Sequence, residues 1–199
     1  MAFQPTLSQF GVPTNTGQQA NGILMPKLKY RFRVSLQGFG PATAATELTR
    51  QVATAGRPQI QHGSTPIHSY NNIMYLAQKP EWQSIEITVR DDVTNSVSIL
   101  VATQLQKQMN HFTQLSPEAG INYKFFTQIE TLDGGNSAPL ETWYLEGCYL
   151  ETVAYDQFDY SNSESMMITL TLRYDNATQD VNTIMPYNTT NSKRGSLIA

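Results

Sequence analysis

The sequence is poor in cysteine, in charge and in long apolar runs. Cys148 is the only cysteine, which excludes an intrachain disulfide and any metal site built from cysteines alone. Asp, Glu, Lys and Arg make up 15% of the 199 residues, and the net charge of -3 gives no general reason to expect affinity for nucleic acid. No run approaches the ~20 apolar residues that a membrane span requires. Residues 1–19 lack both the basic and the apolar region of a secretory signal, so we expect a soluble protein made in a reducing cytoplasm.

Residues able to carry catalysis are also scarce. His62 and His68 could share a metal ion as strand neighbours, but no acidic or thiol ligand stands beside them. Cys148 lies in LEGCYLE without a local histidine, which favours a small buried strand residue over a nucleophile. Asp91 and Asp92 stand between a predicted strand and a predicted helix, where turn formation and capping explain them. We therefore expect neither an enzyme nor a bound metal or cofactor.

The sequence does contain regular alternation of apolar and polar residues, which predicts β-strands. With 40% hydrophobic residues, the chain can also bury a core. Alternation is strictest in residues 28–37, LKYRFRVSLQ, and returns in residues 84–90 and 165–174. The other predicted strands, in chain order, are 47–53, 59–62, 67–70, 73–77, 123–132 and 141–155.

One segment has the period of a helix instead. Apolar residues in 94–112 are spaced three or four apart, as on one face of an amphipathic helix, and Asp92 or Thr94 is the expected N-cap. This is the only helix that the sequence predicts, and its polar face is expected to point outward. The apolar positions are Val97, Leu100, Val101, Leu105, Met109 and Phe112, and the polar face consists of Gln104, Lys107, Gln108 and His111.

The order of these elements predicts a mainly β domain. Many strands, one helix and then more strands favour two packed antiparallel sheets, a sandwich or small barrel with one flanking helix, over a βαβ fold. This domain is expected over residues 27–175. Residues 1–26 and 176–199 are either disordered tails or arms that order on a neighbouring subunit. The expected anchors in the N-terminal arm are Phe3, Leu7 and Phe10.

The strand predicted over residues 28–37 is basic on its polar side. Its aromatic residues and its cations alternate, so they point to opposite faces and cannot line one nucleic-acid groove together. The apolar set is therefore expected in the core, and the cations are expected to pair with carboxylates of a neighbouring strand or subunit. The core set is Leu28, Tyr30, Phe32, Val34 and Leu36, and the candidate subunit contacts are Lys29, Arg31 and Arg33.

Four phrases occur in an order that resembles a known family. They are MPKLKYRFRVSL, SYNNIMYLAQKPEWQSIEITVRDD, NSVSILVATQLQKQMNHF and WYLEGCYLETVAYDQFDYSNSESMMITLTLRYDNA. Together they resemble the tail tube proteins of contractile-tailed, myovirus-type bacteriophages. The resemblance covers roughly residues 25–177, and it lies in the ordered set of phrases and not in any single one.

The resemblance implies a fold related to the tubes of type VI secretion systems and a structural role in the virion. It implies hexameric rings that stack into a tail tube, assembled in the host cytoplasm. The implied partners are further copies of the chain, the tail sheath, the tape measure protein, a baseplate tube initiator and a tail terminator, and double-stranded DNA passes through non-specifically. Such a sheath is what the outward helix face is expected to meet. The alternatives are a baseplate or tail-terminator ring protein and the tube subunit of a type VI-like secretion machine.

Overall fold

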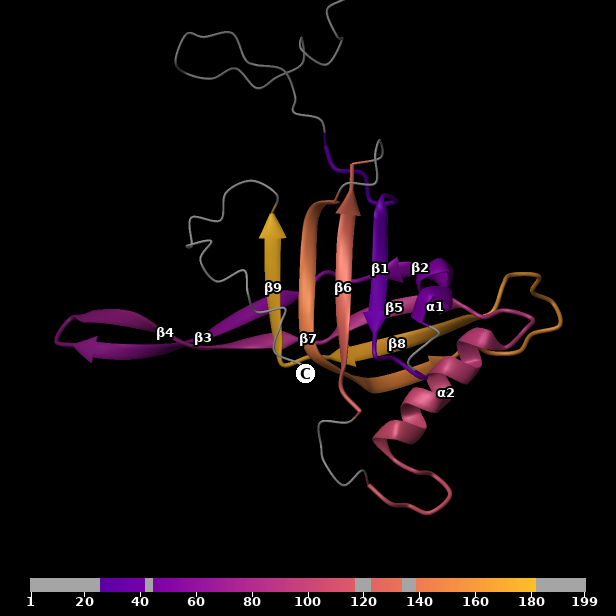
Figure 1. Ribbon diagram of the computed structural model, residues 1–199. Coiled ribbons are helices and arrows are strands. Elements are labelled where there is room, and N and C mark those ends of the chain that lie inside the picture. Colours follow the sequence, from indigo (N-terminus) through magenta and orange to yellow (C-terminus); the bar gives the residue numbers. More distant parts are fainter. Residues whose placement is uncertain (1–25, 42–44, 117–122, 134–138, 182–199) are drawn as a thin grey trace, which may run out of the picture. The chain divides into compact units, whose positions relative to one another are not determined.

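The computed structural model describes residues 26–41, 45–116, 123–133 and 139–181 (Figure 1). The chain divides into two units, Met1–Arg31 and Phe32–Ala199. Within the described residues, the second unit contains the following helices and strands. They are β1 (Phe32–Gln37), α1 (Ala45–Gln51), β2 (Val52–Ala55), β3 (Gln59–Ser69), β4 (Asn72–Gln83), β5 (Ile85–Arg90), α2 (Ser96–Gln108), β6 (Phe125–Leu132), β7 (Pro139–Tyr155), β8 (Met167–Arg173) and β9 (Asn176–Val181).

Two antiparallel sheets share the long strand β7. The first half of β7 pairs with β6 and β9, and β6 pairs with β1. The second half of β7 pairs with β8, which pairs with β5, and β5 pairs with β2. Figure 1 shows the strands of the first sheet running crosswise to those of the second. The path ends at β1 and β2, so the expected pair of antiparallel sheets is confirmed and the chain by itself is not a closed barrel.

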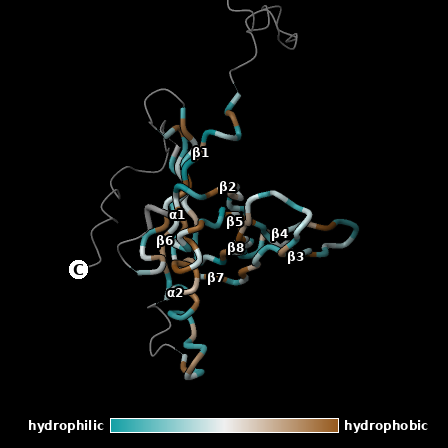
Figure 2. The backbone as a smooth tube through the Cα atoms, turned by 90° about the vertical axis from the view of Figure 1, so that its right-hand side faces the viewer, coloured by the Kyte–Doolittle hydropathy of each residue, from teal (hydrophilic) through white to brown (hydrophobic). Residues whose placement is uncertain are grey.

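The core lies where the two sheets and the two helices meet. Figure 2 shows apolar and polar residues alternating along the strands. On β5 and β8 the apolar members are fully buried, as the alternation predicts. Because β-strands place every second side chain on one face, these positions form one continuous core layer. The buried set of these two strands is Ile85, Ile87, Val89, Ile168, Leu170 and Leu172.

The first strand is shorter than its alternation predicts. β1 begins at Phe32, and residues 28–31 form a turn in which the Arg31 N–H donates to the Leu28 carbonyl. Tyr30 is 72% exposed, so its expected place in the core is wrong, whereas Val34 and Leu36 are buried. The register explains the limit, because Phe32 pairs with Thr131 and β6 ends one residue later. Alternation continues beyond the residues for which a partner strand exists.

Two further elements differ from the prediction. Residues 47–53, expected as a strand, form most of α1 and the start of β2, and Leu48 of α1 is fully buried. Residues 176–181, expected at the start of a C-terminal extension, form β9 on the outer side of β7. The expectation of a single helix and of a sheet ending at residue 175 was therefore wrong.

The helix α2 is shorter than the predicted span of 94–112. The N-cap residue is Asn95, in a left-handed conformation and without a side-chain cap hydrogen bond, so the expected N-cap at Asp92 or Thr94 was wrong. The Asp92 carboxylate still accepts the Val97 N–H of the first helical turn at 3.1 Å. The helix ends before Met109, which is extended. Among the described residues, neither helix is long and apolar enough to cross a membrane.

Candidate assembly surfaces

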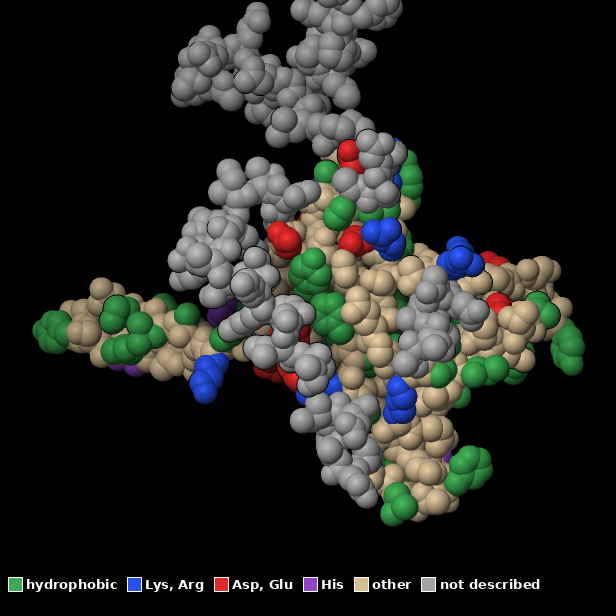
Figure 3. All heavy atoms as spheres, in the orientation of Figure 1, with side chains coloured by type: hydrophobic (Ala, Val, Ile, Leu, Met, Phe, Trp, Pro, Cys, Tyr) green, Lys and Arg blue, Asp and Glu red, His purple; other side chains and the backbone are tan. Residues whose placement is uncertain are grey.

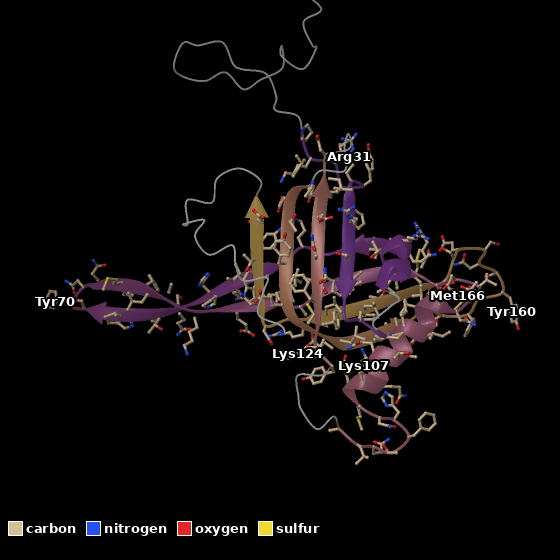
Figure 4. The ribbon with its side chains drawn as sticks, viewed as in Figure 1. Arg31, Tyr70, Lys107, Lys124, Tyr160 and Met166 are labelled. Carbon is tan, nitrogen blue, oxygen red and sulfur yellow. The ribbon has the colours of Figure 1, made fainter. Side chains whose placement is uncertain are left out.

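A long two-stranded ribbon, β3–β4, lies outside both sheets. It replaces the three short strands that the sequence predicts over 59–77, with a bulge near Gly63 and a turn at Tyr70 and Asn71. Every residue from 59 to 81 is exposed. Figure 4 labels Tyr70 at its tip, and Figure 3 shows hydrophobic side chains along it. A lone hairpin of this kind is marginally stable in water.

The ribbon is apolar on both of its faces. Register places Ile67 opposite Met74 on one face and His68 opposite Ile73 on the other. Leu76 shares the first face, and Tyr75 shares the second with Pro66, because opposite residues of a ladder lie on the same side. Met74 is 58% and Tyr75 is 66% exposed. Apolar surface of this extent is typical of a protein interface.

The base of the ribbon is fixed to the sheets. The Trp82 and Tyr174 rings are 5.9 Å apart, and Glu81 pairs with Arg173 at 3.2 Å. Just before β3, the Arg57 guanidinium donates to the Glu141 carboxylate, which is only 2% exposed. These contacts join the ribbon to β7 and β8. The base is therefore anchored, while the distal residues remain exposed.

Two ordered loops also expose large apolar side chains. After α2, the Asn110 side chain accepts the N–H groups of Phe112 and Thr113, and this compact turn leaves Phe112 93% exposed. Between β7 and β8, Phe158 and Tyr160 are exposed, and Figure 4 labels Tyr160 on this loop. Each chain therefore offers apolar side chains on the ribbon and on two separate loops.

The polar row of α2 does not form the expected outward surface. Gln104 is fully buried; its amide donates to the Tyr123 carbonyl at 2.6 Å and accepts the Gly40 N–H at 3.1 Å. Gln108 donates to the Leu150 carbonyl and accepts the Leu150 N–H, both at 2.9 Å.

Lys107, labelled in Figure 4, donates to the Gly38 and Gly40 carbonyls. The row therefore holds backbone groups of this same chain. His111 is exposed, but it lies beyond the end of the helix. The prediction that Gln104 faces outward was wrong, whereas Lys107 and Gln108 are half-buried and bind backbone groups of their own chain.

The spacing of the helix contained the signal for this arrangement. Gln104 follows Val97 by seven residues, and Gln108 follows Val101 by seven, so both extend the buried stripe by two helical turns. Val97 and Val101 are fully buried. A glutamine on the apolar stripe indicates a buried amide that hydrogen-bonds to backbone. Because glutamine is polar, Gln104 and Gln108 were assigned to the polar face of the helix instead.

The three cations of the first segment do not share a strand. Arg33 pairs with Glu130 at 2.5 Å, directly opposite it in the β1–β6 register, which confirms the expected pairing with a neighbouring carboxylate. Lys29 and Arg31 lie in the turn before β1, where the Arg31 guanidinium stands 5.5 Å from the centre of the Tyr30 ring. Their role as subunit contacts stays a prediction. The expected anchors Phe3, Leu7 and Phe10 lie outside the described residues.

No metal centre assembles among the described residues. They contain no group of three or more His, Cys, Asp or Glu side chains placed to hold a metal ion. Cys148 is fully buried, as expected, and burial raises the pKa of its thiol to about 11. At neutral pH this thiol is protonated and is not a nucleophile.

The chain has no match among family models or curated protein sequences, but solved structures share its fold. A structure of the anti-feeding prophage cap, the tube terminating cap, has a TM-score of 0.62 at 12% identity, over 84% of this chain and 99% of that chain. A structure of the anti-feeding prophage baseplate has a TM-score of 0.56 at 13% sequence identity, over 81% of this chain and 100% of that chain.

A third structure is the sheath–tube complex of the extracellular contractile injection system PVC in its extended state, with a TM-score of 0.54 at 17% identity, over 78% of this chain and 92% of that chain. At these identities the likeness establishes the fold alone. This chain has the fold of proteins found in contractile injection systems.

Proposed function

We propose that this chain is the repeating structural subunit of the inner tube of a contractile bacteriophage tail. Copies form hexameric rings, and the rings stack into a tube that a contractile sheath surrounds. The tube encloses a tape measure protein during assembly and conducts double-stranded DNA during ejection. The chain acts by assembly and not by catalysis, as expected of a fold shared with tube, cap and baseplate structures.

The β3–β4 ribbon is the observation that carries this proposal. It exposes apolar side chains on both faces, although nothing in the described part of its own chain covers them. Burying one such side chain stabilises a complex by about 1.5–3 kcal/mol. A ribbon that is anchored at its base and apolar beyond it is suited to insert into neighbouring copies.

The same chain also offers surfaces able to receive the ribbon. The loops that carry Phe112 and Tyr160 are ordered, apolar at their tips and separate from the ribbon in the sequence. Contact between one patch on a subunit and a different patch on the next is heterologous, and it generates rings or open stacks instead of closed pairs. A tube needs both arrangements.

The test replaces one apolar residue on each face of the ribbon, in the double variant Met74→Lys, Tyr75→Lys. The wild-type chain is expected to form rings and long tubes in negative-stain micrographs. The concentration at which the variant forms tubes is expected to rise by about tenfold or more for each buried side chain that is lost. At concentrations below the assembly threshold of the wild type, its thermal midpoint should equal the wild-type value, because neither residue contributes to the core.

Val93→Lys is the matched control, because Val93 is an exposed apolar residue outside the ribbon. This variant should assemble as the wild type does. If the double variant forms tubes of normal length at the wild-type concentration, the ribbon does not take part in assembly. A wild-type chain that stays monomeric under all conditions, even with a tube-initiating baseplate, would contradict the proposed function.

The likeness to the anti-feeding prophage cap favours a second candidate, a ring protein that ends a tube or belongs to a baseplate. Both candidates share the fold and the hexameric ring. They differ in growth, because a tube subunit adds ring upon ring without limit and a terminator stops after one. Electron micrographs of the purified chain at increasing concentration distinguish the two outcomes.

A further inference from the structure

Within the part of the chain that the structure describes, the second half of β7 has a partner strand on one side only. β6 pairs with β7 as far as the Phe125–Cys148 pair, and from Tyr149 onward the described partner of β7 is β8. An unpaired strand edge presents a row of N–H and C=O groups to which another strand can add. Residues 149–155 would form such an edge, which we name the β7 edge.

A side chain of α2 occupies the beginning of this edge. The Gln108 amide donates to the carbonyl and accepts from the N–H of the same residue, Leu150, with both distances 2.9 Å. A residue of an antiparallel strand exchanges the same two bonds with the residue opposite it. Because a carboxamide carries the donor and acceptor of a peptide group, Gln108 takes the place of one strand residue at the point where β6 has ended.

The neighbouring residues support closure of the edge. The β7–β8 register shifts between Leu150 and Thr152, so Glu151 forms a bulge, and its charged side chain is exposed. Bulges and charges are common protection for strand edges. Gln104 lies one turn before Gln108 and holds the Tyr123 carbonyl just before β6 begins. The helix therefore fixes both sides of the place where β6 and β7 part.

We propose that the β7 edge is a latent strand-pairing surface that Gln108 keeps closed, and that the partner it excludes is an extended strand of a second copy of this chain. α2 then covers a sheet edge and directs association to other surfaces. Closure is a property of the single chain and does not depend on the proposed function. In a tube subunit it would prevent copies from joining in a wrong arrangement.

Amide hydrogen exchange of Leu150 in the monomeric chain tests the closure. Gln108→Ala removes both bonds and Gln108→Lys removes the acceptor, so Leu150 should exchange at least about tenfold faster in both variants. Gln108→Glu keeps an acceptor oxygen and should leave the amide protected. Gln106→Ala, on the exposed side of the same helix, is the matched control and should change nothing at Leu150.

Self-association tests the excluded partner. Gln108→Ala should form concentration-dependent oligomers in light scattering under conditions where the wild type is monomeric. Adding Ala154→Lys should suppress them while Leu150 continues to exchange rapidly, because Ala154 is an exposed residue of the edge and a lysine there opposes strand addition.

Two results would overturn the proposal: unchanged Leu150 exchange in Gln108→Ala, or faster exchange without added self-association. If Gln108→Ala fails to fold, the contrast between Gln108→Lys and Gln108→Glu decides, and equal exchange in these two variants rejects the closure. Tube formation by the wild-type chain is measured separately, so failure of the proposed function leaves the exchange result intact.

Discussion

Asp92 organises the start of α2 through a single carboxylate. It accepts the Val97 N–H at 3.1 Å and the Ser96 hydroxyl at 2.6 Å, and it also accepts the Thr94 hydroxyl. These hydrogen bonds, led by that of Ser96, lower the pKa of Asp92 from 3.8 to about 2. The charged form is therefore favoured in the folded chain, and the helix start depends on it.

The depressed pKa predicts a pH dependence of stability. Its stabilising contribution is fully present above the unfolded value of 3.8 and is lost as the pH falls through about 2. Asp92→Asn should lower the thermal midpoint at pH 7, and the difference from the wild type should shrink between pH 4 and pH 2. Glu86→Gln removes one exposed charge on β5 and is the control in the same melts. A midpoint difference that is constant from pH 7 to pH 2 would contradict this assignment.

At the scale of the element, Gly147 lets β7 serve two sheets. Its φ of 67° is left-handed, and it lies near the end of the half of β7 that pairs with β6 and β9, two residues before the pairing with β8 begins at Tyr149. A Cβ at this position would meet the Asp175 carboxylate, with 2.7 Å to Cγ. The glycine is therefore needed both for the backbone conformation and for the close approach of Asp175, which pairs with Lys124.

Gly147→Ala should consequently destabilise the chain. The left-handed conformation costs about 1–2 kcal/mol for a residue with a Cβ, and the displaced Asp175 adds to this loss. Urea unfolding at neutral pH measures the change in free energy. Gly63→Ala is the control, because its backbone is not left-handed and its nearest contact is the flexible end of Gln78. Equal destabilisation by both changes would show that backbone conformation at Gly147 is not the cause.

Alternation in the sequence predicts the central strands well and the edges poorly. β5 and β8 lie within the predicted limits. Each of these strands has one face in the core and the other outside it, so its sequence alternates along its whole length. β1 starts four residues late, since only β6 decides where pairing begins. β9 was missed because its place is set by β7 in the first sheet and not by its own pattern.

The candidate assembly site shows the same limit in another form. The sequence predicts three short strands where one ribbon exists, because polar HGST interrupts the pattern and a bulge at Gly63 absorbs the interruption. The burial of Gln104 was missed because a polar side chain can be buried on an apolar helix face only when it has hydrogen-bond partners there. Its partners are backbone groups of other segments, which the local sequence does not reveal. Those partners, Gly40 and Tyr123, lie far from it in the sequence.

For the whole molecule, the ribbon and the body of the chain are separable parts. The Trp82–Tyr174, Glu81–Arg173 and Arg57–Glu141 contacts all lie at the base of the ribbon. Replacing residues 64–77 by a two-residue Asn-Gly turn removes the distal part and keeps these anchors. Because the core cluster contains no residue of the removed segment, this shortened chain should fold with a thermal midpoint close to that of the wild type.

The shortened chain tests whether growth has a direction. In a heterologous stack, a subunit without the ribbon can still bind a neighbour's ribbon, but it has no ribbon to bind the next subunit. A tube end that incorporates a shortened subunit therefore stops growing. Adding about one shortened chain to ten wild-type chains should therefore shorten the tubes in negative-stain micrographs far more than dilution alone. The same amount of Val93→Lys chain should leave tube length unchanged. Tubes of normal length that exclude the shortened chain entirely would mean that the body does not receive a ribbon, and that ribbon pairs with ribbon instead.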